Sequence, residues 1–521
     1  MGLLVTYFVT LIFLLSPCGG NLLLSDRWWI DQSPVSWAIQ CHYPTNPRGD
    51  GSSSLCAKTL HINCRQSSVR AVYQNVVLKT PASELVLSVR ANGEQLETAA
   101  VSYFLGLLAM IDLRPSGKAF VEVPIDTSRL TGHPSDEPIP AYATYVAPPN
   151  KTFDSITLMA GCHGYIGSVY LSEMEMVAML DGTPVKGSPC RSELEPVERE
   201  YGKIHPYKPV YLLGEPHQGD FGGLRDDISL VTQVSMDRLG VLEHTLDQWD
   251  MPVSLVIYAP LKALRNADDD WQRLYISKKV TAFKLHPSSV VCLVYASSVS
   301  EQYPINSLRN IAIKQAHSQF LLLADADFQP SPDLAPKVLP LIRNRTKKFL
   351  KSAVVIPAFE YADVPHKSDV VAANKHELMQ LIHAQGIVCP FRRQDAPQSH
   401  AATDYWRWYT AREPYEVHLF SDKFEPYLVI EKNAHLPLYW EKFVGYGMNK
   451  ISHMTELRVA GYNLWVAPDS WLIHVPHRLS THFADHLQNA TYRLSNRALR
   501  FEFQDHLRYK YGLECNDERV F

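Results

Sequence analysis

The sequence predicts an α/β domain that is preceded by an all-β sandwich, and three observations carry this prediction. Residues 21–180 contain short runs in which apolar and polar residues alternate, which is the period of half-buried strands. From about residue 226 onward, continuous apolar runs alternate with segments of helical period. Between them, residues 181–222 have neither period and are rich in glycine and proline, so we expect a linker there and a second domain over 223–521.

Length and composition place the chain among ordinary globular proteins. Its 521 residues allow each domain a core of its own. Hydrophobic residues make up 46% and charged residues 20%, and the formal net charge is -4. This near-neutral balance argues against a nucleic-acid partner and against a polybasic membrane-binding patch.

The first 20 residues, MGLLVTYFVTLIFLLSPCGG, predict a signal peptide. The apolar stretch from Leu3 to Leu15 is short for a membrane span, and small residues follow it. We therefore expect entry into the secretory pathway, with the Golgi lumen favoured and secretion as the alternative. No basic residue precedes the apolar stretch, so an uncleaved signal anchor stays open, and membrane contact is expected only in that case.

The cysteines fit an oxidising compartment. Once Cys18 leaves with the signal peptide, eight cysteines remain, and five of them precede residue 200. We expect disulfides in the first half, although their pairing cannot be deduced from the sequence, and the lack of any C-x-x-C pair argues against a zinc ribbon. Cys292, within the apolar run VVCLVY, is predicted to be a buried free thiol. N-x-[ST] sequons agree with a secretory route and occur at Asn150, Asn344 and Asn489.

The first domain is predicted from its strands. In ELVLSV, residues Leu85, Leu87 and Val89 fall on one face. Turn-forming clusters such as ANGE and TGHPSDEP separate this run from others of the same kind, at 119–125, 155–160 and 172–176. The pattern is typical of a sandwich. Its order of short strands resembles a carbohydrate-binding jelly roll in general pattern, and a role as a spacer is the alternative.

The second domain is predicted from alternating strands and helices. Strands are expected at 227–236, 253–260, 290–296 and 320–328, and helices at 237–249 and 306–318. This alternation favours a mostly parallel sheet with helices on both faces. In such sheets, ligands bind beyond the carboxyl ends of the strands.

Two aspartates follow the last of these strands. Leu321 to Leu323 are expected in the sheet core, so Asp325 and Asp327 leave the strand at its carboxyl end. Because side chains alternate along an extended chain, both carboxylates can face the same side. Carboxylate oxygens suit Mg²⁺ or Mn²⁺ bound to a diphosphate, whereas a solvated turn with a helix cap is the structural alternative.

Three long blocks of the second domain resemble the LARGE-like glycosyltransferases, which form family 49 and include the β-1,4-glucuronyltransferases. The blocks are residues 229–258, 303–334 and 443–457, and the resemblance runs in order from about 226 to about 485 without covering the first domain. It implies a GT-A fold, which is a Rossmann-like nucleotide-sugar fold, and an inverting, metal-dependent, glucuronosyltransferase-like enzyme. The donor would be a UDP-sugar and the acceptor a glycan or glycoprotein. Glucuronic acid is the favoured sugar, N-acetylglucosamine and xylose stay open, and a glycan-binding pseudoenzyme is the alternative function.

The same resemblance implies a metal site. Asp325 and Asp327 would hold Mn²⁺, or alternatively Mg²⁺, against the donor diphosphate, where the ion stabilises negative charge on the departing UDP. His474 follows the apolar stretch SWLI and is the favoured third ligand, with His477 second. The alternative is that both histidines only form hydrogen bonds in a loop that contains Pro476.

Inversion requires a general base, and a carboxylate within hydrogen-bond reach is the usual device. We favour Glu425, which stands beside Pro426 and Tyr427 in a rigid aromatic turn. The other candidates are Asp404, Glu360 and Glu456. A structural role is the alternative for each of them.

Further residues are predicted to contact donor or acceptor. Arg309 and Asn310 precede the aspartate pair on a helix and could meet the diphosphate. The pattern VGYGMNK suggests close backbone approach at Gly445 and Gly447. Sugar-ring stacking and polar contacts are assigned to Asp404, Tyr405, Trp406, Trp408, Tyr427, Asn449 and Lys450. A metal-dependent hydrolase is disfavoured because the sequence lacks an H-E-x-x-H motif.

Overall fold

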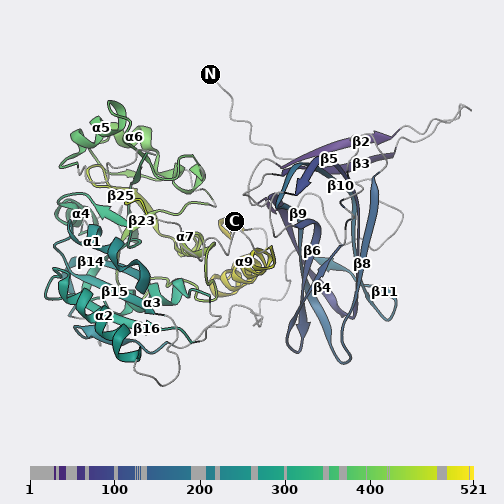
Figure 1. The fold of residues 1–521 in the computed structure, drawn as a ribbon, viewed down its shortest axis with the longest axis horizontal. Coiled ribbons are helices and arrows are strands. Elements are labelled where there is room, and N and C mark those ends of the chain that lie inside the picture. The colour runs from purple at the N-terminus through teal and green to yellow at the C-terminus, as the bar shows by residue number, and fades with distance from the viewer. Residues whose placement is uncertain are drawn as a thin grey trace, which may run out of the picture. The chain divides into compact units, whose positions relative to one another are not determined.

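Figure 1 shows the fold of the chain as a computed structural model. It describes residues 29–30, 35–42, 55–64, 70–98, 104–123, 125, 127, 130, 138–188, 207–217, 223–259, 268–297, 302–343, 351–362, 372–394, 396–418, 421, 423–477, 490–514 and 517–520. The predicted signal peptide and the sequons at Asn344 and Asn489 lie outside these residues. Within them, helices are all too short or too polar to span a bilayer.

The chain divides into two compact units. Residues 1–203 and 483–515 form the first, which we call the β unit, and residues 204–482 and 516–521 form the second, which we call the α/β unit. The boundary falls inside the predicted linker of 181–222. The sequence-based division differs at the C-terminal end, because residues 483–515 belong to the β unit.

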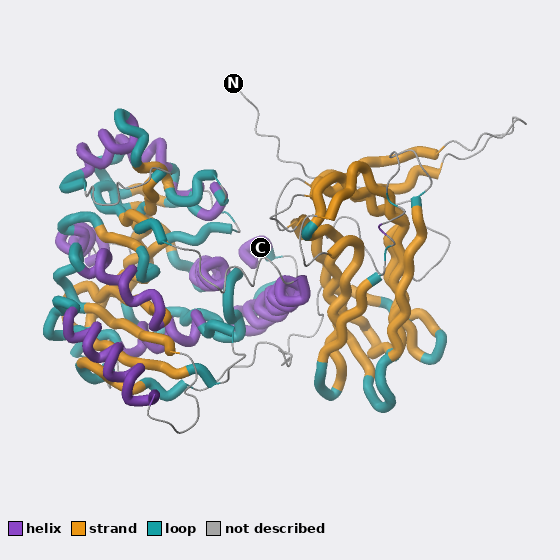
Figure 2. The backbone as a smooth tube through the Cα atoms, in the orientation of Figure 1, coloured by secondary structure: helices purple, strands orange, loops and turns teal. Residues whose placement is uncertain are grey.

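The β unit contains two six-stranded antiparallel sheets, drawn as strands in Figure 2. The β9 sheet has the order β1 (Trp29–Ile30), β4 (Arg70–Ala82), β9 (Thr152–His163), β6 (Phe104–Arg114) and β7 (Lys118–Glu122), with β12 (Gly187–Ser188) paired to β4. The β10 sheet has the order β2 (Val35–His42), β3 (Leu55–Cys64), β10 (Tyr165–Leu180), β5 (Glu84–Thr98) and β8 (Ile139–Val146), with β11 (Thr183–Pro184) paired to β10.

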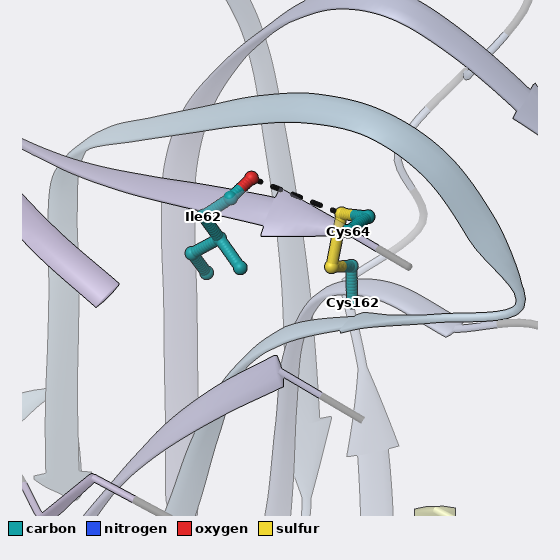
Figure 3. The surroundings of a disulfide bond; sticks show 3 residues. All are labelled: Ile62, Cys64 and Cys162. Carbon is teal, nitrogen blue, oxygen red and sulfur yellow. Dashed lines mark hydrogen bonds between the residues drawn. A yellow bond between two sulfur atoms is a disulfide. The ribbon is translucent and has the colours of Figure 1, made fainter. Parts of the chain in front are cut away.

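One hydrophobic core lies between these sheets. Leu85, Leu87 and Val89 alternate with more accessible residues along β5, as expected from the sequence, and pack in one cluster with Ile156 and Leu158 of β9. A disulfide between Cys64 on β3 and Cys162 on β9 joins the two sheets and confirms the expectation of a disulfide in the first half (Figure 3). Since it links residues 98 positions apart, it constrains the unfolded chain by roughly 4–5 kcal/mol in the chain-entropy account.

A C-terminal helix packs on the β9 sheet. This helix, α9 (Ala490–Tyr511), contacts β9, β6 and β4. The guanidinium of Arg497 lies 4.8 Å from the ring centroid of Tyr73. Beneath the helix, the sheet buries the polar side chains of Asn75 and Thr157, and Thr157 Oγ1 donates to Asn75 Oδ1 at 3.1 Å. The period of a helix does not indicate which sheet the helix covers, and this explains the different domain division.

The predicted linker also contains paired strands. β11 and β12 complete the two sheets of the β unit, and β13 (Val210–Leu213) pairs with β16 (Val290–Tyr295) of the α/β unit. These strands are two to four residues long. They are too short to show a period, so the sequence marks the region as aperiodic.

The α/β unit is built on a nine-stranded sheet. Its order is β13, β16, β15 (Val253–Ala259), β14 (Arg225–Ser235), β17 (Ser318–Leu323), β23 (Tyr427–Glu431), β19 (Ser352–Ile356), β24 (Asn463–Val466) and β22 (Tyr415–Glu416). The four predicted strands are β14 to β17, which run parallel as expected. Beyond β17 the sheet is mixed, because β23 is antiparallel to both of its neighbours. The α/β class is confirmed, whereas the parallel arrangement holds for only part of the sheet.

Helices pack on both faces of this sheet. Buried side chains of α1 (Leu239–Leu246), α2 (Asp268–Ala282) and α4 (Leu334–Arg343) join one hydrophobic cluster. Those of α3 (Ile305–Gln315), α5 (Lys375–His383), α6 (Tyr405–Thr410) and α7 (Asn449–Val459) join the other. The helices predicted at 237–249 and 306–318 correspond to α1, with a preceding 3₁₀ turn η3 (Met236–Arg238), and to α3.

A second, four-stranded sheet follows β17 in the chain. Its order is β18 (Phe328–Pro330), β25 (Leu472–His474), β20 (Ala358–Tyr361) and β21 (Val388–Pro390). Residues 324–327 connect β17 to β18, so the aspartate pair lies between the two sheets. This junction positions the candidate site.

Candidate active site

The aspartate pair projects toward the α3 side of the main sheet. Leu321 and Leu323 are buried in the cluster that contains α3, whereas Ala324, Ala326 and Phe328 are buried in the opposite cluster. The alternation expected from the sequence thus continues past the end of β17. It directs Asp325 and Asp327 to one side, at the carboxyl end of the strand.

Asp325 is held by two cations and a phenol. Its carboxylate accepts a hydrogen bond from Arg309 Nη2 at 2.6 Å, from Lys450 Nζ at 3.0 Å and from the Tyr427 hydroxyl at 3.0 Å. Burial raises the pKa of Asp325, but the charges of Lys450 and Arg309 outweigh it and leave that pKa well below its usual range. Asp325 is therefore ionised across the physiological range.

Strand pairing places two histidines beside Asp327. β18 and β25 are antiparallel with Phe328 opposite His474, and the backbone N–H of Val475 donates to Asp327 O at 2.8 Å. His477 Nε2 lies 2.8 Å from Asp327 Oδ2, and His474 Nε2 lies 3.8 Å from the same oxygen. The two imidazole Nε2 atoms are 3.2 Å apart.

These three side chains could hold a metal ion. One atom each of Asp327, His474 and His477 lies within 4.8 Å of the others. The second carboxylate oxygen of Asp327, Oδ1, is buried without a hydrogen-bond partner in the described part of the chain. Burial raises the pKa of Asp327, but the two adjacent histidines and the charge of Arg238 outweigh it and leave that pKa well below its usual range. A carboxylate with two imidazoles is a donor set that divalent transition ions accept.

Arg238 is a residue of this site that the sequence reasoning missed. It ends η3, directly after β14, and its Nη2 lies 3.2 Å from Asp327 Oδ2 and 2.7 Å from His477 Nε2. A cationic group therefore already compensates the carboxylate of Asp327. A basic residue just beyond the carboxyl end of a predicted strand is the signal that could have identified it.

The aspartates line a cavity of about 250 Å³. Its lining includes four cationic residues, Arg238, Arg309, Arg392 and Lys450, against three carboxylates, Asp325, Asp327 and Glu425. Glu425 is thus the one lining carboxylate outside the aspartate pair, and its backbone N–H donates to Ser399 O at 2.8 Å. Such an excess of cationic groups favours an anionic ligand.

The loop VGYGMNK forms one wall of the cavity. Gly445, Gly447 and Met448 have positive φ angles of 66°, 99° and 63°. Glycine adopts this conformation at no steric cost, so the chain can turn tightly and begin α7 at Asn449. Residues 445–450 all line the cavity, and the positive end of the α7 dipole therefore adjoins it.

Five of the predicted contact residues, among them Asn310, Asp404 and Trp406, lie outside the cavity lining. The Asn310 side chain is buried and bonds the backbone of Tyr439 in both directions, at 2.8 and 2.9 Å. Asp404 caps α6 and accepts from Arg407 N at 3.2 Å. Trp406 is 79% exposed. In the described structure, Asn310 anchors a loop, Asp404 caps a helix and Trp406 occupies a surface position.

Other candidates from the sequence also have structural contacts. Glu360 accepts the backbone N–H of Arg392 at 2.9 Å, and Glu456 is buried within α7. Trp408 lies in the hydrophobic core, and the hydroxyl of Tyr405 donates to Ala358 O at 2.6 Å. None of these four side chains lines the described cavity.

Arg392 was also missed by the sequence reasoning. It lines the cavity, has a positive φ of 56°, and donates from Nη1 to the Tyr446 hydroxyl at 2.9 Å. A left-handed conformation at a non-glycine residue costs about 1 kcal/mol or more, and such residues cluster at ligand sites. No sequence pattern identifies Arg392, because its position depends on the turn after β21.

Comparison with known proteins identifies relatives of the second half of the chain. Residues 227–512 match the family described as glycosyl-transferase for dystroglycan. The chain is 34% identical over 288 residues to xylosyl- and glucuronyltransferase LARGE2 of Mus musculus, covering 55% of this chain and 39% of that protein. It is 32% identical over 286 residues to LARGE1 of Homo sapiens, covering 55% and 36%. The chain thus matches about two-fifths of the length of these relatives.

Two solved structures are among those with similarity to the chain. For S. aureus TarS 1-349 in complex with UDP-GlcNAc, the TM-score is 0.32 and the identity 14%, over 53% of this chain and 66% of that chain. For GalNAc-T7 with UDP, GalNAc and Mn²⁺, the TM-score is 0.32 and the identity 15%, over 57% and 55%.

Proposed function

The chain belongs to the family described as glycosyl-transferase for dystroglycan, and from this premise we propose that its α/β unit transfers a sugar from a UDP-sugar to a glycan or glycoprotein acceptor. The transfer is metal-dependent and inverts the anomeric centre. One observation carries the proposal: Asp327, His474 and His477 form a cluster beside Asp325, and the two aspartates and His474 line a cavity with an excess of cationic side chains. The α/β architecture supports assignment to the GT-A class.

The residues present fit a divalent ion. Asp327, His474 and His477 would hold it, with Asp325 at its side, and the buried Oδ1 of Asp327 supplies a ligand atom. Mn²⁺ suits this mixed carboxylate and imidazole set, and Mg²⁺ is the alternative. When bound, the ion supplies Lewis-acid stabilisation of the diphosphate leaving group.

The donor diphosphate is assigned to the cationic side chains around the aspartates. Arg309 and Lys450 reach Asp325 from α3 and from the first turn of α7, and both line the cavity. Their donors could turn from the carboxylate to phosphate oxygens, and Arg238 could do the same beside Asp327. The N-terminal end of α7 adds backbone N–H groups with the same preference for anions.

Glu425 is proposed as the general base. It lines the same cavity, and the other two lining carboxylates are held by cations and histidines. A carboxylate in this position can accept the proton of the acceptor hydroxyl as that oxygen attacks the sugar. The structural contacts of Asp404, Glu360 and Glu456 support this choice over the alternatives from the sequence.

Glucuronic acid is the donor sugar we favour. The relatives named above are xylosyl- and glucuronyltransferases, and the cavity contains a fourth cationic residue, Arg392, which donates to the Tyr446 hydroxyl. A guanidinium can bind a carboxylate through two parallel hydrogen bonds. Xylose and N-acetylglucosamine are the other donors to test.

A lumenal location in the secretory pathway is also proposed, with the Golgi favoured. The Cys64–Cys162 disulfide supports it, because such bonds persist in oxidising compartments. Asn150, one of the three sequon residues, lies in an exposed turn.

A donor screen tests the proposed function. The purified full chain is incubated with Mn²⁺ and UDP-glucuronate, UDP-xylose or UDP-N-acetylglucosamine in the presence of glycan acceptors, and UDP release is measured. We expect turnover that EDTA abolishes, with UDP-glucuronate the preferred donor. Donor binding without turnover on any acceptor would instead identify a pseudoenzyme, and turnover unaffected by EDTA would contradict the metal site.

A further inference from the structure

The two sheets of the β unit differ in what covers their outer faces. α9 packs on the β9 sheet, whereas no described helix packs on the β10 sheet. On β8, at the edge of the β10 sheet, Tyr142 is 73% exposed and Val146 is 63% exposed. The outward face of the β10 sheet is therefore accessible along β8.

Strand register identifies the residues of this outward face. Leu85 to Ala91 place every second side chain in the core, so Ser88 and Arg90 point outward from β5. Ser88 pairs with Tyr142 of β8 on one side, and Asn92 pairs with Tyr170 of β10 on the other. Tyr170 in turn pairs with His61 of β3.

Aromatic rings lie at two places on the face. His61 and Tyr170 are stacked with ring centroids 4.6 Å apart and an interplanar angle of 10°. Tyr142 lies two strands from Tyr170 and four residues along the register, a separation of roughly 16 Å from ordinary strand spacings. That separation suits a short oligosaccharide, and Arg90 lies between the two aromatic positions in register.

Hydrogen-bonding groups accompany the rings. The Tyr170 hydroxyl donates to Glu94 Oε2 at 3.3 Å, which fixes both side chains on the face. The rings offer apolar surfaces to the C–H groups of a pyranose, and carboxylate and guanidinium groups bind its hydroxyls. This mixture of chemistry differs from a protein-binding patch, whose centre is depleted of charged residues.

The net charge of the face favours neutral glycans over anionic ones. Three carboxylates, Glu84, Glu94 and Glu175, occupy outward positions of β5 and β10 with one guanidinium, Arg90. A polymer of uronic acids would meet net repulsion there. A neutral oligosaccharide would not.

We propose that the outward face of the β10 sheet is a binding site for neutral oligosaccharides, in which Tyr142 and the His61–Tyr170 pair stack on sugar rings while Arg90 and Glu94 bind hydroxyls. The site is separate from the cavity of the α/β unit. It does not depend on the proposed transfer reaction, and it gives the β unit a function of its own.

Titration calorimetry on the full chain tests the site, with EDTA present and UDP-sugar omitted so that the catalytic cavity is not engaged. The probes are cellohexaose, xylohexaose, mannohexaose and, as the charged comparison, a galacturonate hexamer. We expect at least one neutral hexamer to bind and the galacturonate hexamer to bind more weakly. No binding of any neutral hexamer, or tighter binding of the galacturonate hexamer, overturns the proposal.

Substitutions locate the site. Tyr142→Ala should weaken binding of the neutral hexamer about tenfold, since one stacking surface is lost. The matched control is Tyr509→Ala, which removes a tyrosine that is 54% exposed on α9 and should leave affinity unchanged. Equal affinity of the Tyr142 variant and the wild type contradicts the assignment of this face. Both tyrosines are exposed, so neither variant should unfold.

Discussion

The cavity of the α/β unit and the outward face of the β10 sheet use different chemistry. In the cavity, each aspartate is within 3.2 Å of a cationic side chain, at 2.6 Å for Asp325 and Arg309 and at 3.2 Å for Asp327 and Arg238. On the sheet face, the key groups are rings, and Tyr142 is mostly exposed. The comparison indicates that ligand binding in the cavity depends on charge, whereas ligand binding on the sheet face depends on the surfaces of aromatic rings. Substitutions that remove charge at constant volume should therefore distinguish the two regions.

Asp327→Asn should have the largest effect. The change removes one charge with little change in volume, so the cluster with His474 and His477 loses its carboxylate. UDP release should fall below detection, whereas hexamer binding by the β10 sheet should stay at the wild-type level. Measuring both quantities on one preparation tests the comparison directly. Turnover that persists in this variant and resists EDTA would refute the metal site.

Glu425→Gln should lower kcat about 100-fold or more, because the acceptor hydroxyl loses its proton acceptor. Mn²⁺ and UDP binding should be unchanged, since Glu425 is not among the aspartate–histidine cluster. The readout is kcat together with UDP affinity. Loss of UDP binding in this variant would assign Glu425 to donor binding instead.

Asp325→Asn should reduce both activity and stability. The carboxylate compensates Arg309 and Lys450, whose side chains are 10% and 15% exposed. Without its charge, these cations keep their burial and lose their counter-ion, at a cost of about 1–3 kcal/mol. Thermal unfolding should show a lower Tm than that of Asp327→Asn, since the cation beside Asp327, Arg238, is 28% exposed and can be hydrated. An equal Tm for the two variants would argue against the ion-pair account.

Lowering the pH should reduce the stability of both units. The groups responsible are buried histidines rather than the aspartates of the cavity. Burial, and next the charge of Arg493, lowers the pKa of His163 in the β unit to about 4. Burial likewise lowers the pKa of His453 in the α/β unit to about 4. Each folded pKa lies below the unfolded value of about 6.5. The contribution of these neutral histidines to the free energy of unfolding is therefore fully present above pH 6.5 and is lost as the pH falls toward 4.

Hydrogen–deuterium exchange at pH 7 and pH 5, corrected for intrinsic rates, can measure this effect separately in β9 and α7. Protection should fall at pH 5 in both elements, and His163→Asn should remove the fall in β9 only. Asp325 and Asp327 stay ionised over this range because their pKa values are depressed. Greater protection at pH 5 would contradict the sign.

Some residues of the cavity could be predicted from the sequence, whereas others could not. Leu321 to Leu323 identify a buried strand, and alternation then determines where Asp325 and Asp327 point. His474 could be found because it follows an apolar stretch, and its pairing with Phe328 fixes its place. The positions of these residues follow from local apolar runs and from the alternation of side chains along a strand, and both can be read from the sequence.

Other features depend on which segments meet in space. Arg238 and Arg392 enter the cavity from turns whose neighbours are distant in the chain. Asp404 and Trp406 lie within the span of about 226–485 that resembles the family, yet helix capping and surface exposure account for their described positions. α9 has a clear helical sequence, but nothing local indicates that it packs on the β9 sheet.

The central claim is that Asp327, His474 and His477 hold a divalent ion for transfer. It is tested most directly by UDP release as a function of Mn²⁺ concentration, for wild type, His474→Ala and His477→Ala. Each substitution removes one of the three clustered ligands and leaves the carboxylates in place. We predict that both curves shift to higher Mn²⁺ and that activity recovers partly at saturation. Wild-type metal dependence in both variants would contradict the account, because loss of a hydrogen bond alone gives no rescue by metal.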